Sequence, residues 1–450
     1  MNEREAQYEL YRHQPDALRF DKQRDVVRDR SDLIALFCSR RAGKTEEFAF
    51  EVAETLATVR DAHAIFIGLS AKSARQIFFS KFKRLNIAHK WGFVSNEQSL
   101  SFIHPSTGST CLVFGSDQRS DIEKAAGLSR VVLLILDECG LWRQDFLRYT
   151  IEEIVGPAME DVPGGRVMLG GTPGRILSGF WYELTHEGKY PQYSRHSWKL
   201  RDNPFMPPDV EEKVLKKFGW TRDTPEFRRQ YLGEWVIDPS TLVFSNFSDA
   251  NIRSCPWKPA YGSLLSLDFG VVHSTAFLVL AQYKHHKAVM VPFSEERHGT
   301  DVASGTNPTA VADRAKALKE KYHCSRIIGD LGGIGKAYAQ EMLVRHHICI
   351  EPADKHDKLA LIEMVNDAFG QRKLEIDPSN VELIRQLRTL QWDELHADIA
   401  EGQRDDLVED LCYGYQQTNH VYVAPPEPTD EPVMYKPPAK PYWAVDMGAR

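Results

Sequence analysis

Short apolar runs alternate with amphipathic stretches along the first 200 residues. After the first run, apolar side chains recur at Phe48, Val52 and Leu56, which is the spacing of one helix face. Strands that alternate with helices predict an α/β domain with a parallel sheet, whose ligands bind beyond the carboxyl ends of the strands. The predicted strands are residues 33–37, 64–69, 110–116, 131–136 and 166–171, and a further helix is predicted at Phe146–Met159.

The pattern changes after residue 200. Residues 202–235 are mostly helical, and residues 238–262 are rich in turn residues and lack periodicity, so we place a domain boundary there. Beyond it, three apolar runs between 263 and 293 predict a β-meander, and helices then alternate with the short strands RIIGD and KLEID. The length of 450 residues fits two or three domains.

The first strand runs into the loop Ser39–Thr45, SRRAGKT. In a loop of this kind the backbone N–H groups cradle phosphates, the lysine reaches the β- and γ-phosphates, and the hydroxyl binds Mg²⁺. Lys44 and Thr45 would take these two roles. The usual pattern has a glycine where this chain has Cys38, so the motif alone is also compatible with a flexible turn that exposes a lysine.

The strand at 131–136 strengthens the nucleotide interpretation, because it ends in Asp137 and Glu138. In a phosphate-hydrolysing site the first carboxylate would hold the Mg²⁺ complex, and the second would orient the attacking water. Thr172 follows the strand at 166–171, where a hydroxyl that senses the γ-phosphate would lie if the two strands are neighbours. Together these motifs predict an ATPase.

Acidic residues stand at corresponding places in the second half. Asp268 and Asp330 each end a strand, and a third group opens a helix. A single strand-end aspartate is usually a cap, but three that converge would repel one another without cations, and their natural use is a pair of Mg²⁺ or Mn²⁺ ions that cleave a phosphodiester. The third group comprises Asp405, Asp406 and Asp410.

Several other features have two interpretations. Gln23 or Gln14 could contact an adenine, or lie on a helix surface. The His-His pairs at 285 and 346 lack ligand spacing, and residues 424–450, with seven of the 24 prolines, predict an extended tail that could dock on a partner. A basic helix could face DNA or solvent; its cations are Lys72, Arg75, Lys81, Lys83 and Arg84.

Composition adds mainly exclusions. The net charge is −7, so contact with nucleic acid would depend on local basic surfaces. The seven cysteines include no CxxC pair, which argues against a zinc ribbon or a disulfide framework and favours reduced thiols. No apolar run approaches the roughly 20 residues of a membrane span.

With these motifs in their order, the chain resembles the large terminase subunit of tailed bacteriophages over nearly its whole length. SRRAGKT is similar to that family's deviant Walker A motif, LILDE at 134–138 to its Walker B motif, and GGTPG at 170–174 to its coupling motif. The resemblance implies a RecA/ASCE-like P-loop ATPase domain followed by a ribonuclease H-like nuclease domain. The implied domains are 1–240, with a lid near 202–237, then 241–423 and the tail 424–450.

The resemblance also implies roles for individual residues. Arg40 or Arg41 would serve as an arginine finger or phosphate sensor, Glu138 as the catalytic glutamate, and Gln23 as the adenine-binding glutamine. The nucleotide-binding loop would comprise Ser39, Arg40, Arg41, Ala42, Gly43, Lys44 and Thr45. The metal-binding acids of the nuclease would be Asp268, Asp330 and Asp406, with Asp405 and Asp410 as further candidates.

The implied function is translocation of double-stranded DNA into a procapsid, driven by ATP with Mg²⁺, and cleavage of that DNA at a site with two Mg²⁺ or Mn²⁺ ions. The implied partners are the portal protein, a small terminase subunit and further copies of the chain in a ring of five, in the host cell cytoplasm. Two alternatives remain: a helicase-like DNA-dependent ATPase with an accessory domain, and a structural DNA-binding protein in which the acids are caps.

Overall fold

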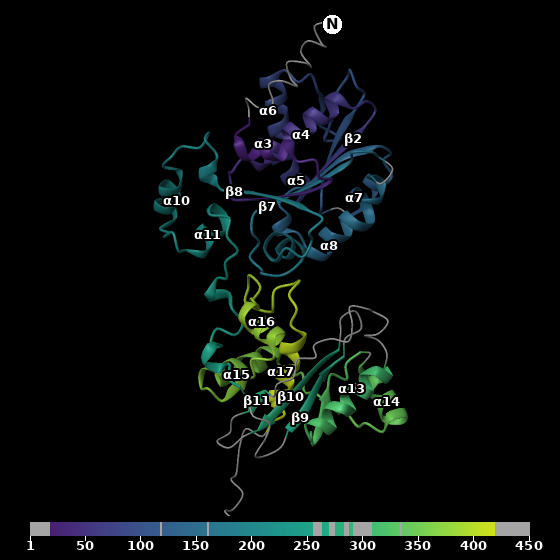
Figure 1. The fold of residues 1–450 in the computed structure, drawn as a ribbon, viewed down its shortest axis with the longest axis vertical. Coiled ribbons are helices and arrows are strands. Elements are labelled where there is room, and N and C mark those ends of the chain that lie inside the picture. Colours follow the sequence, from purple (N-terminus) through teal and green to yellow (C-terminus); the bar gives the residue numbers. More distant parts are fainter. Residues whose placement is uncertain are drawn as a thin grey trace, which may run out of the picture. The chain divides into compact units, whose positions relative to one another are not determined.

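The computed structural model describes residues 19–117, 119–159, 162–254, 263–269, 275–282, 288–290, 308–333 and 335–418 (Figure 1). The chain forms two compact units. Unit 1 comprises Met1–Asp249, Asp357–Gly370 and Val381–Glu409, and unit 2 comprises Ala250–His356, Gln371–Asn380 and Asp410–Arg450. The chain first passes from unit 1 to unit 2 between Asp249 and Ala250, within the turn-rich stretch 238–262. The domain bounds 1–240 and 241–423 stay a prediction.

Unit 1 is built on an eight-stranded sheet in the order β3-β4-β5-β2-β6-β7-β1-β8. β4 pairs antiparallel with both β3 and β5, and the other pairs of neighbouring strands are parallel. The predicted α/β parallel sheet is therefore present. The strands are β1 (Leu33–Cys38), β2 (His63–Gly68), β3 (Val94–Asn96), β4 (Ser101–Ile103), β5 (Thr110–Gly115), β6 (Val131–Leu136), β7 (Arg166–Gly171) and β8 (Ser194–Trp198).

Alternate residues of the central strands enter two different hydrophobic cores. In β1, Ile34 and Leu36 belong to one core, whereas Ala35 belongs to the other. α4 (Lys44–Thr58) and α6 (Ser80–His89) cover the first face, and α8 (Gln144–Tyr149) covers the second (Figure 1). Because both faces are covered, the strands are apolar throughout rather than alternating.

Unit 1 also contains further helical segments. Among those that the structure describes are α3 (Asp21–Arg28), α5 (Ala71–Ala74), α7 (Arg119–Ala126), α9 (Phe180–Tyr182), α10 (Val210–Phe218), α11 (Pro225–Tyr231), α15 (Lys358–Gly370) and α16 (Val381–Thr389). α10 and α11 lie within residues 202–235, where the sequence predicts helices. They pack around Phe227, Leu215 and Leu200, which form a small core of their own.

The predicted helix Phe146–Met159 is not one continuous α-helix. It begins earlier, at Gln144, changes to a π-helix over Thr150–Val155 and ends in a 3₁₀ turn at Pro157–Met159. The amide of Gly156 donates to the carbonyl of Ile151 (2.9 Å), and a Cβ on Gly156 would collide with that oxygen. A glycine therefore permits the wider turn, a local effect that apolar spacing does not reveal.

A buried ion-pair group joins the start of the described chain to α4. The Arg19 guanidinium donates from Nε to both carboxylate oxygens of Glu47 (2.9 Å each) and from Nη1 to Glu54 (2.5 Å). Burial alone would lower the pKa of Arg19, but the charges of Glu47 and Glu54 raise it above its ordinary value. Arg19 is thus held as a cation inside the protein.

We expect Arg19→Ala to lower the free energy of unfolding by about 3–5 kcal/mol, because it leaves the Glu47 carboxylate buried without its cation. The control is Arg148→Ala, whose pair with Glu152 (2.9 Å) is half-exposed and should be worth about 0.5 kcal/mol. Urea unfolding of both variants gives the comparison. Equal losses would show that the Arg19 group contributes no more than a surface pair.

Unit 2 contains a six-stranded mixed sheet in the order β13-β12-β9-β10-β11-β14. β9, β10 and β11 form the predicted antiparallel meander, while β12 pairs parallel with β9. One face packs on α13 (Pro308–Lys321) and α14 (Gly335–His346). The strands are β9 (Ser263–Asp268), β10 (Ala276–Gln282), β11 (Ala288–Met290), β12 (Arg326–Gly329), β13 (Glu351–Pro352) and β14 (Leu374–Ile376).

The last described helix, α17 (Asp406–Gln416), begins in unit 1 and continues into unit 2. Across the part of the chain that the structure describes, no helix is long and apolar enough to span a bilayer. Gln14, His285 and the tail 424–450 lie outside the described residues.

Candidate active sites

The loop between β1 and α4 is held by its surroundings. Gly43 has φ +96°, a left-handed conformation that favours glycine, and it precedes the first residue of α4, Lys44. The indole of Trp198 donates to the carbonyl of Ala42 (2.8 Å), and the Leu200 amide donates to the hydroxyl of Ser39 (2.7 Å). Contacts with β8 and the segment after it therefore fix the loop at both ends.

Cys38, where the usual motif has a glycine, is fully buried at the end of β1. Burial raises the pKa of its thiol, so the side chain is neutral. It belongs to the core that α4 covers. The loop therefore accommodates the cysteine side chain at position 38, where the usual motif has a glycine.

Lys44 meets the end of β6. Its ammonium forms an ion pair with Asp137 and lies 3.6 Å from the carboxylate of Glu138. The Thr45 hydroxyl donates to the other oxygen of Asp137 (3.4 Å). Burial alone would lower the pKa of Lys44, but the two carboxylates raise it, so the lysine stays charged. The structure thus brings Lys44 and Thr45 together with Asp137 and Glu138, which lie about ninety positions later in the sequence.

β7 lies between β6 and β1 and pairs in parallel with both. Gly170 of β7 packs against Lys44, since a Cβ there would lie 2.8 Å from the lysine Cδ. Thr172, directly after this strand, therefore stands between the ends of the two motif strands. The proposed sensor role of Thr172 requires that β7 lies next to β6, the strand that precedes Asp137. The structure shows this pairing.

Arg40 is engaged with the helix α11. Its amide donates to the carbonyl of Gln230 (2.6 Å), and its guanidinium donates to the side-chain oxygen of the same residue (3.0 Å). Arg41 is exposed and has φ +59°. In this structure Arg40 thus links the loop to the predicted lid region, and its role as an arginine finger stays a prediction.

Gln23 lies beside the same loop. Its amide nitrogen donates to the carbonyl of Gly43 (3.0 Å), and its oxygen accepts a hydrogen bond from the Phe20 amide (3.3 Å). The side chain is buried, so Gln23 is not a surface residue of its helix. Contact with an adenine stays a prediction.

The basic helix carries much of its charge in ion pairs. Lys81 contacts Glu46 (3.0 Å), and both Lys83 (2.7 Å) and Arg75 (3.6 Å) contact Glu97. Two carboxylates therefore pair with three of its five cations and offset only part of the positive charge, and a DNA-facing role stays a prediction.

In unit 2, Asp268 and Asp330 lie side by side. Gly329 of β12 pairs with Leu267 of β9, and the next amide, that of Asp330, donates to the carbonyl of Leu267 (3.2 Å). One oxygen of Asp330 accepts a hydrogen bond from the Gly332 amide (2.7 Å), and the other forms an ion pair with Lys355. Parallel pairing thus places two of the predicted acids at one edge of the sheet.

Asp410 lies on the same face of β9. The hydroxyl of Ser266 donates to its carboxylate and to its carbonyl oxygen (3.1 Å). Ser266 and Asp268 are two positions apart in one strand, so their side chains project from the same face. Of the three acids in the third group, Asp410 therefore contacts β9, the strand that ends in Asp268.

The two preceding acids have other partners. Asp406 accepts a hydrogen bond from the Gln386 amide (2.7 Å), and Asp405 lies 3.5 Å from the ammonium of Lys358. Burial, together with the nearby charge of Glu409, raises the pKa of Asp405 to about 6. Asp406 and Asp410 are four residues apart in α17 and so share one face of that helix.

Within the described residues, no group of three or more histidine, cysteine, aspartate or glutamate side chains is placed to hold a metal ion. Three of the acids each contact a donor of their own: Lys355 contacts Asp330, Gln386 contacts Asp406 and Ser266 contacts Asp410. The assignment of these acids to a metal site stays a prediction.

Residues 36–248 match the family model described as terminase large subunit, T4likevirus-type, N-terminal. This part of the chain is thus similar to the N-terminal region of large terminases. The large terminase of bacteriophage HK97 has a similar structure, with a TM-score of 0.52 and 15% identity over 86% of this chain and 91% of that one. This likeness supports the predicted α/β fold.

Two further solved large terminase structures have TM-scores below 0.5. One from a thermophilic bacteriophage has a TM-score of 0.42 and 17% identity, over 88% of this chain and 97% of that one. The nuclease of the thermophilic phage G20c with bound magnesium has a TM-score of 0.31 and 20% identity, over 39% of this chain and 97% of that one. Comparison with curated proteins gives no match.

Sequence reasoning missed several residues around the two candidate sites. Lys355, which pairs with Asp330, and Trp198, which holds Ala42, belong to no motif. Asn203 is buried beside Gly43, with its amide nitrogen 3.3 Å from where a Cβ would stand. Of these residues, only Asn203 lies in a region that the sequence singled out, the predicted lid near 202–237.

Proposed function

We propose that this chain is a motor subunit that hydrolyses ATP to move double-stranded DNA into a procapsid and cuts that DNA at a metal-dependent site. The observation that carries the proposal is the meeting of Lys44 and Thr45 with Asp137 and Glu138 at the end of a parallel sheet. The match of residues 36–248 to the large terminase model supports the same conclusion.

In the ATPase, the loop from Ser39 to Gly43 would surround the phosphates with backbone N–H groups. Lys44 would then exchange its partner Asp137 for the β- and γ-phosphates. Thr45 and Asp137 fit a Mg²⁺ ion, because a hydroxyl and a carboxylate are oxygen ligands and already lie 3.4 Å apart. Bound there, Mg²⁺ would screen the charge of the phosphates.

Glu138 would orient the attacking water, and Thr172 would detect the γ-phosphate. Glu138 is about one-third exposed and has φ +58°, so its side chain leaves the strand direction at the end of β6. A non-glycine residue in this conformation is strained and persists only where its surroundings enforce it. Arg40 or Arg41 would complete the charge stabilisation after a rearrangement of the contact with Gln230.

In the nuclease, Asp268 and Asp330 would hold a divalent cation at the sheet edge, with one or more of Asp405, Asp406 and Asp410 as further ligands. Two adjacent carboxylates suit Mg²⁺ or Mn²⁺, which would supply an activated water and neutralise the leaving oxygen. Lys355 now balances the charge of Asp330. The proposed partners are double-stranded DNA, the portal protein, a small terminase subunit and a ring of five copies, in the host cell cytoplasm.

The proposal is tested on the full chain by two measurements: ATP hydrolysis with and without double-stranded DNA, and Mn²⁺-dependent nicking of plasmid DNA. We expect DNA-stimulated hydrolysis and metal-dependent nicking. Hydrolysis without nicking would favour the helicase-like alternative, and the absence of both would leave a structural DNA-binding protein.

The position of Lys355 leads to a separate prediction. Because its ammonium competes with a metal ion for Asp330, we expect Lys355→Met to bind Mn²⁺ about two- to fivefold more tightly, the range for a partly exposed ion pair. Titration calorimetry measures the affinity, and Lys319→Met, on an exposed part of α13, is the control. Unchanged or weaker binding in the Lys355 variant would argue against a metal at Asp330.

A further inference from the structure

The loops that follow β6 and β7 pack backbone against backbone. A Cβ on Gly140 would collide with the carbonyl oxygen of Thr172 and lie 3.0 Å from the amide of Gly174. A Cβ on Gly171 would in turn lie 3.0 Å from the amide of Cys139. Only glycines allow this approach, so the loop that carries Glu138 and the loop that carries Thr172 form one contact surface.

One side chain, that of Gln144, joins the two loops. Its amide nitrogen donates to the carbonyls of Cys139 (2.9 Å) and Trp142 (2.8 Å), and its oxygen accepts a hydrogen bond from the Trp181 amide (2.7 Å). Gly179, with φ +88°, lies so close that a Cβ there would be 2.5 Å from Gln144 Cγ. Both donors of the amide and its acceptor oxygen are thus used.

The two tryptophans extend this contact to the proposed catalytic residues. The indole of Trp142 donates to the carbonyl of Asp137 (2.9 Å), and the indole of Trp181 donates to the carbonyl of Thr172 (3.1 Å). Gln144 holds the backbone of both tryptophans. Through them, it connects the carbonyl that precedes Glu138 with the carbonyl of the proposed phosphate sensor.

We propose that Gln144 is a positioning residue that keeps the Glu138 loop and the Thr172 loop in one fixed arrangement. This inference rests on the proposed ATPase function. Glu138 needs such support because its left-handed conformation is strained. A loosened loop would misplace the glutamate relative to the attacking water, and a small misplacement of a catalytic group greatly reduces the rate. The nucleotide would still bind, because the loop at Ser39–Lys44 makes no contact with Gln144 among the hydrogen bonds described here.

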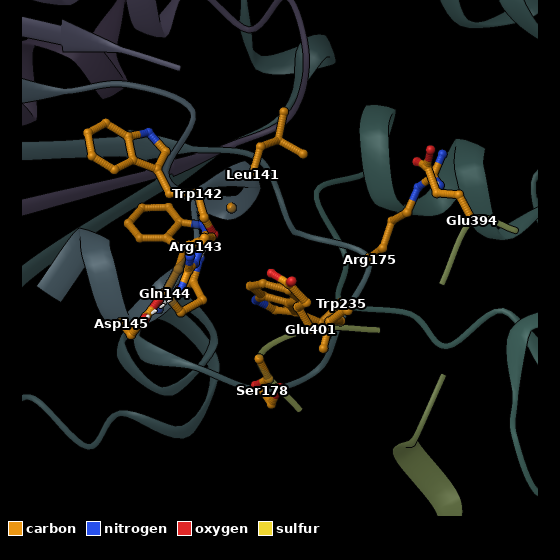
Figure 2. A pocket seen from close by; sticks show the side chains of 14 residues that line it. Leu141, Trp142, Arg143, Gln144, Asp145, Arg175, Ser178, Trp235, Glu394 and Glu401 are labelled. Atoms are coloured by element: carbon orange, nitrogen blue, oxygen red, sulfur yellow. Dashed lines mark hydrogen bonds and ion pairs between the residues drawn. The ribbon is translucent and has the colours of Figure 1, made fainter. Parts of the chain in front are cut away.

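Truncation of Gln144 should be tolerated by the fold. A cavity of about 650 Å³ lies beside it, lined in part by Trp142, Gln144 and Trp235 (Figure 2). Water from this cavity can replace the lost amide at the carbonyls of Cys139 and Trp142. A water molecule would not hold both loops in place, so the variant should fold with a looser junction.

The first test compares Gln144→Ala with wild type in ATP hydrolysis and in the binding of a non-hydrolysable ATP analogue. We expect kcat to fall at least about tenfold while KM and the Kd of the analogue change less than twofold. The matched control is Gln403→Ala, because Gln403 also donates to two carbonyls, those of Gln391 (2.7 Å) and Ala400 (3.1 Å), and accepts from one amide. Its kcat should equal that of wild type.

A double-mutant cycle tests whether Gln144 acts on the catalytic loop through Trp142. Trp142→Phe removes the donor to the carbonyl of Asp137, so its effect on kcat should not add to that of Gln144→Ala if both act through the same junction. Additive effects, or an equal loss of kcat in Gln403→Ala, would reduce Gln144 to a structural residue.

Hydrogen exchange separates this inference from the proposed function. Amides in both segments, residues 137–145 and 170–175, should exchange faster in Gln144→Ala and remain unchanged in Gln403→Ala. Faster exchange in only one segment, or in neither, would overturn the positioning role. If both segments loosen but the wild-type chain hydrolyses no ATP, the junction is real and the proposed ATPase function is wrong.

Discussion

Lys44→Ala is expected to lower ATP hydrolysis at least about 100-fold, because the lysine is the cation closest to the site proposed for the phosphates, and removal of a preorganised charge of this kind costs two or more orders of magnitude. Nuclease activity of the same protein should be unchanged. Hydrolysis is measured by phosphate release, and cleavage by plasmid nicking. Unchanged hydrolysis would remove Lys44 from the site.

A loss of stability would complicate this result, since Lys44 also balances the buried carboxylate of Asp137. We expect Lys44→Ala to cost about 3–5 kcal/mol of unfolding free energy. The double variant Lys44→Met with Asp137→Asn removes both charges and should recover most of this stability without recovering hydrolysis. Lys81→Ala is the control, because its pair with Glu46 lies outside the site.

Asp268→Asn is expected to produce the opposite pattern: Mn²⁺-dependent cleavage falls at least about 100-fold, while ATP hydrolysis is retained. An amide keeps the shape of the carboxylate but lacks the negative charge that a divalent cation requires. Plasmid nicking and Mn²⁺ titration measure the two effects.

The control for Asp268 is Asp377→Asn. Asp377 also follows a strand, β14, but it caps a turn, accepting hydrogen bonds from the amide (2.9 Å) and hydroxyl (2.7 Å) of Ser379. Its replacement should affect stability alone. If both variants cleave DNA as wild type does, Asp268 is a cap like Asp377, and the nuclease must be sought elsewhere in the chain.

The outcome for Asp268 also shows how far a strand-end acid can be interpreted from sequence. Asp268, Asp330 and Asp377 all follow short apolar runs, and the sequence pattern alone does not distinguish them. What separates them is strand pairing, since β9 and β12 are neighbours in the sheet, whereas β14 pairs with β11. Pairing depends on residues about sixty positions apart, which local spacing does not encode.

The ATPase motifs behave differently, because their chemistry is largely local. The loop at Ser39–Lys44 lies between a strand and a helix, and this order fixes which side chains point towards its centre. The expectation that Lys44 and Asp137 meet needed one further rule, that the ends of parallel strands face one ligand site. The structure satisfies this rule through the insertion of β7 between β6 and β1.

The sequence by itself determined the succession of most strands and helices, because apolar spacing reports burial residue by residue. The motifs SRRAGKT, LILDE and GGTPG, in their order, carried the family resemblance. Tertiary structure alone decided which donors occupy the acids, with Lys355 on Asp330 and Gln386 on Asp406, and how Gln144 joins two loops. These partners are distant in sequence or depend on side-chain direction, and packing brings them together only once the whole chain has folded.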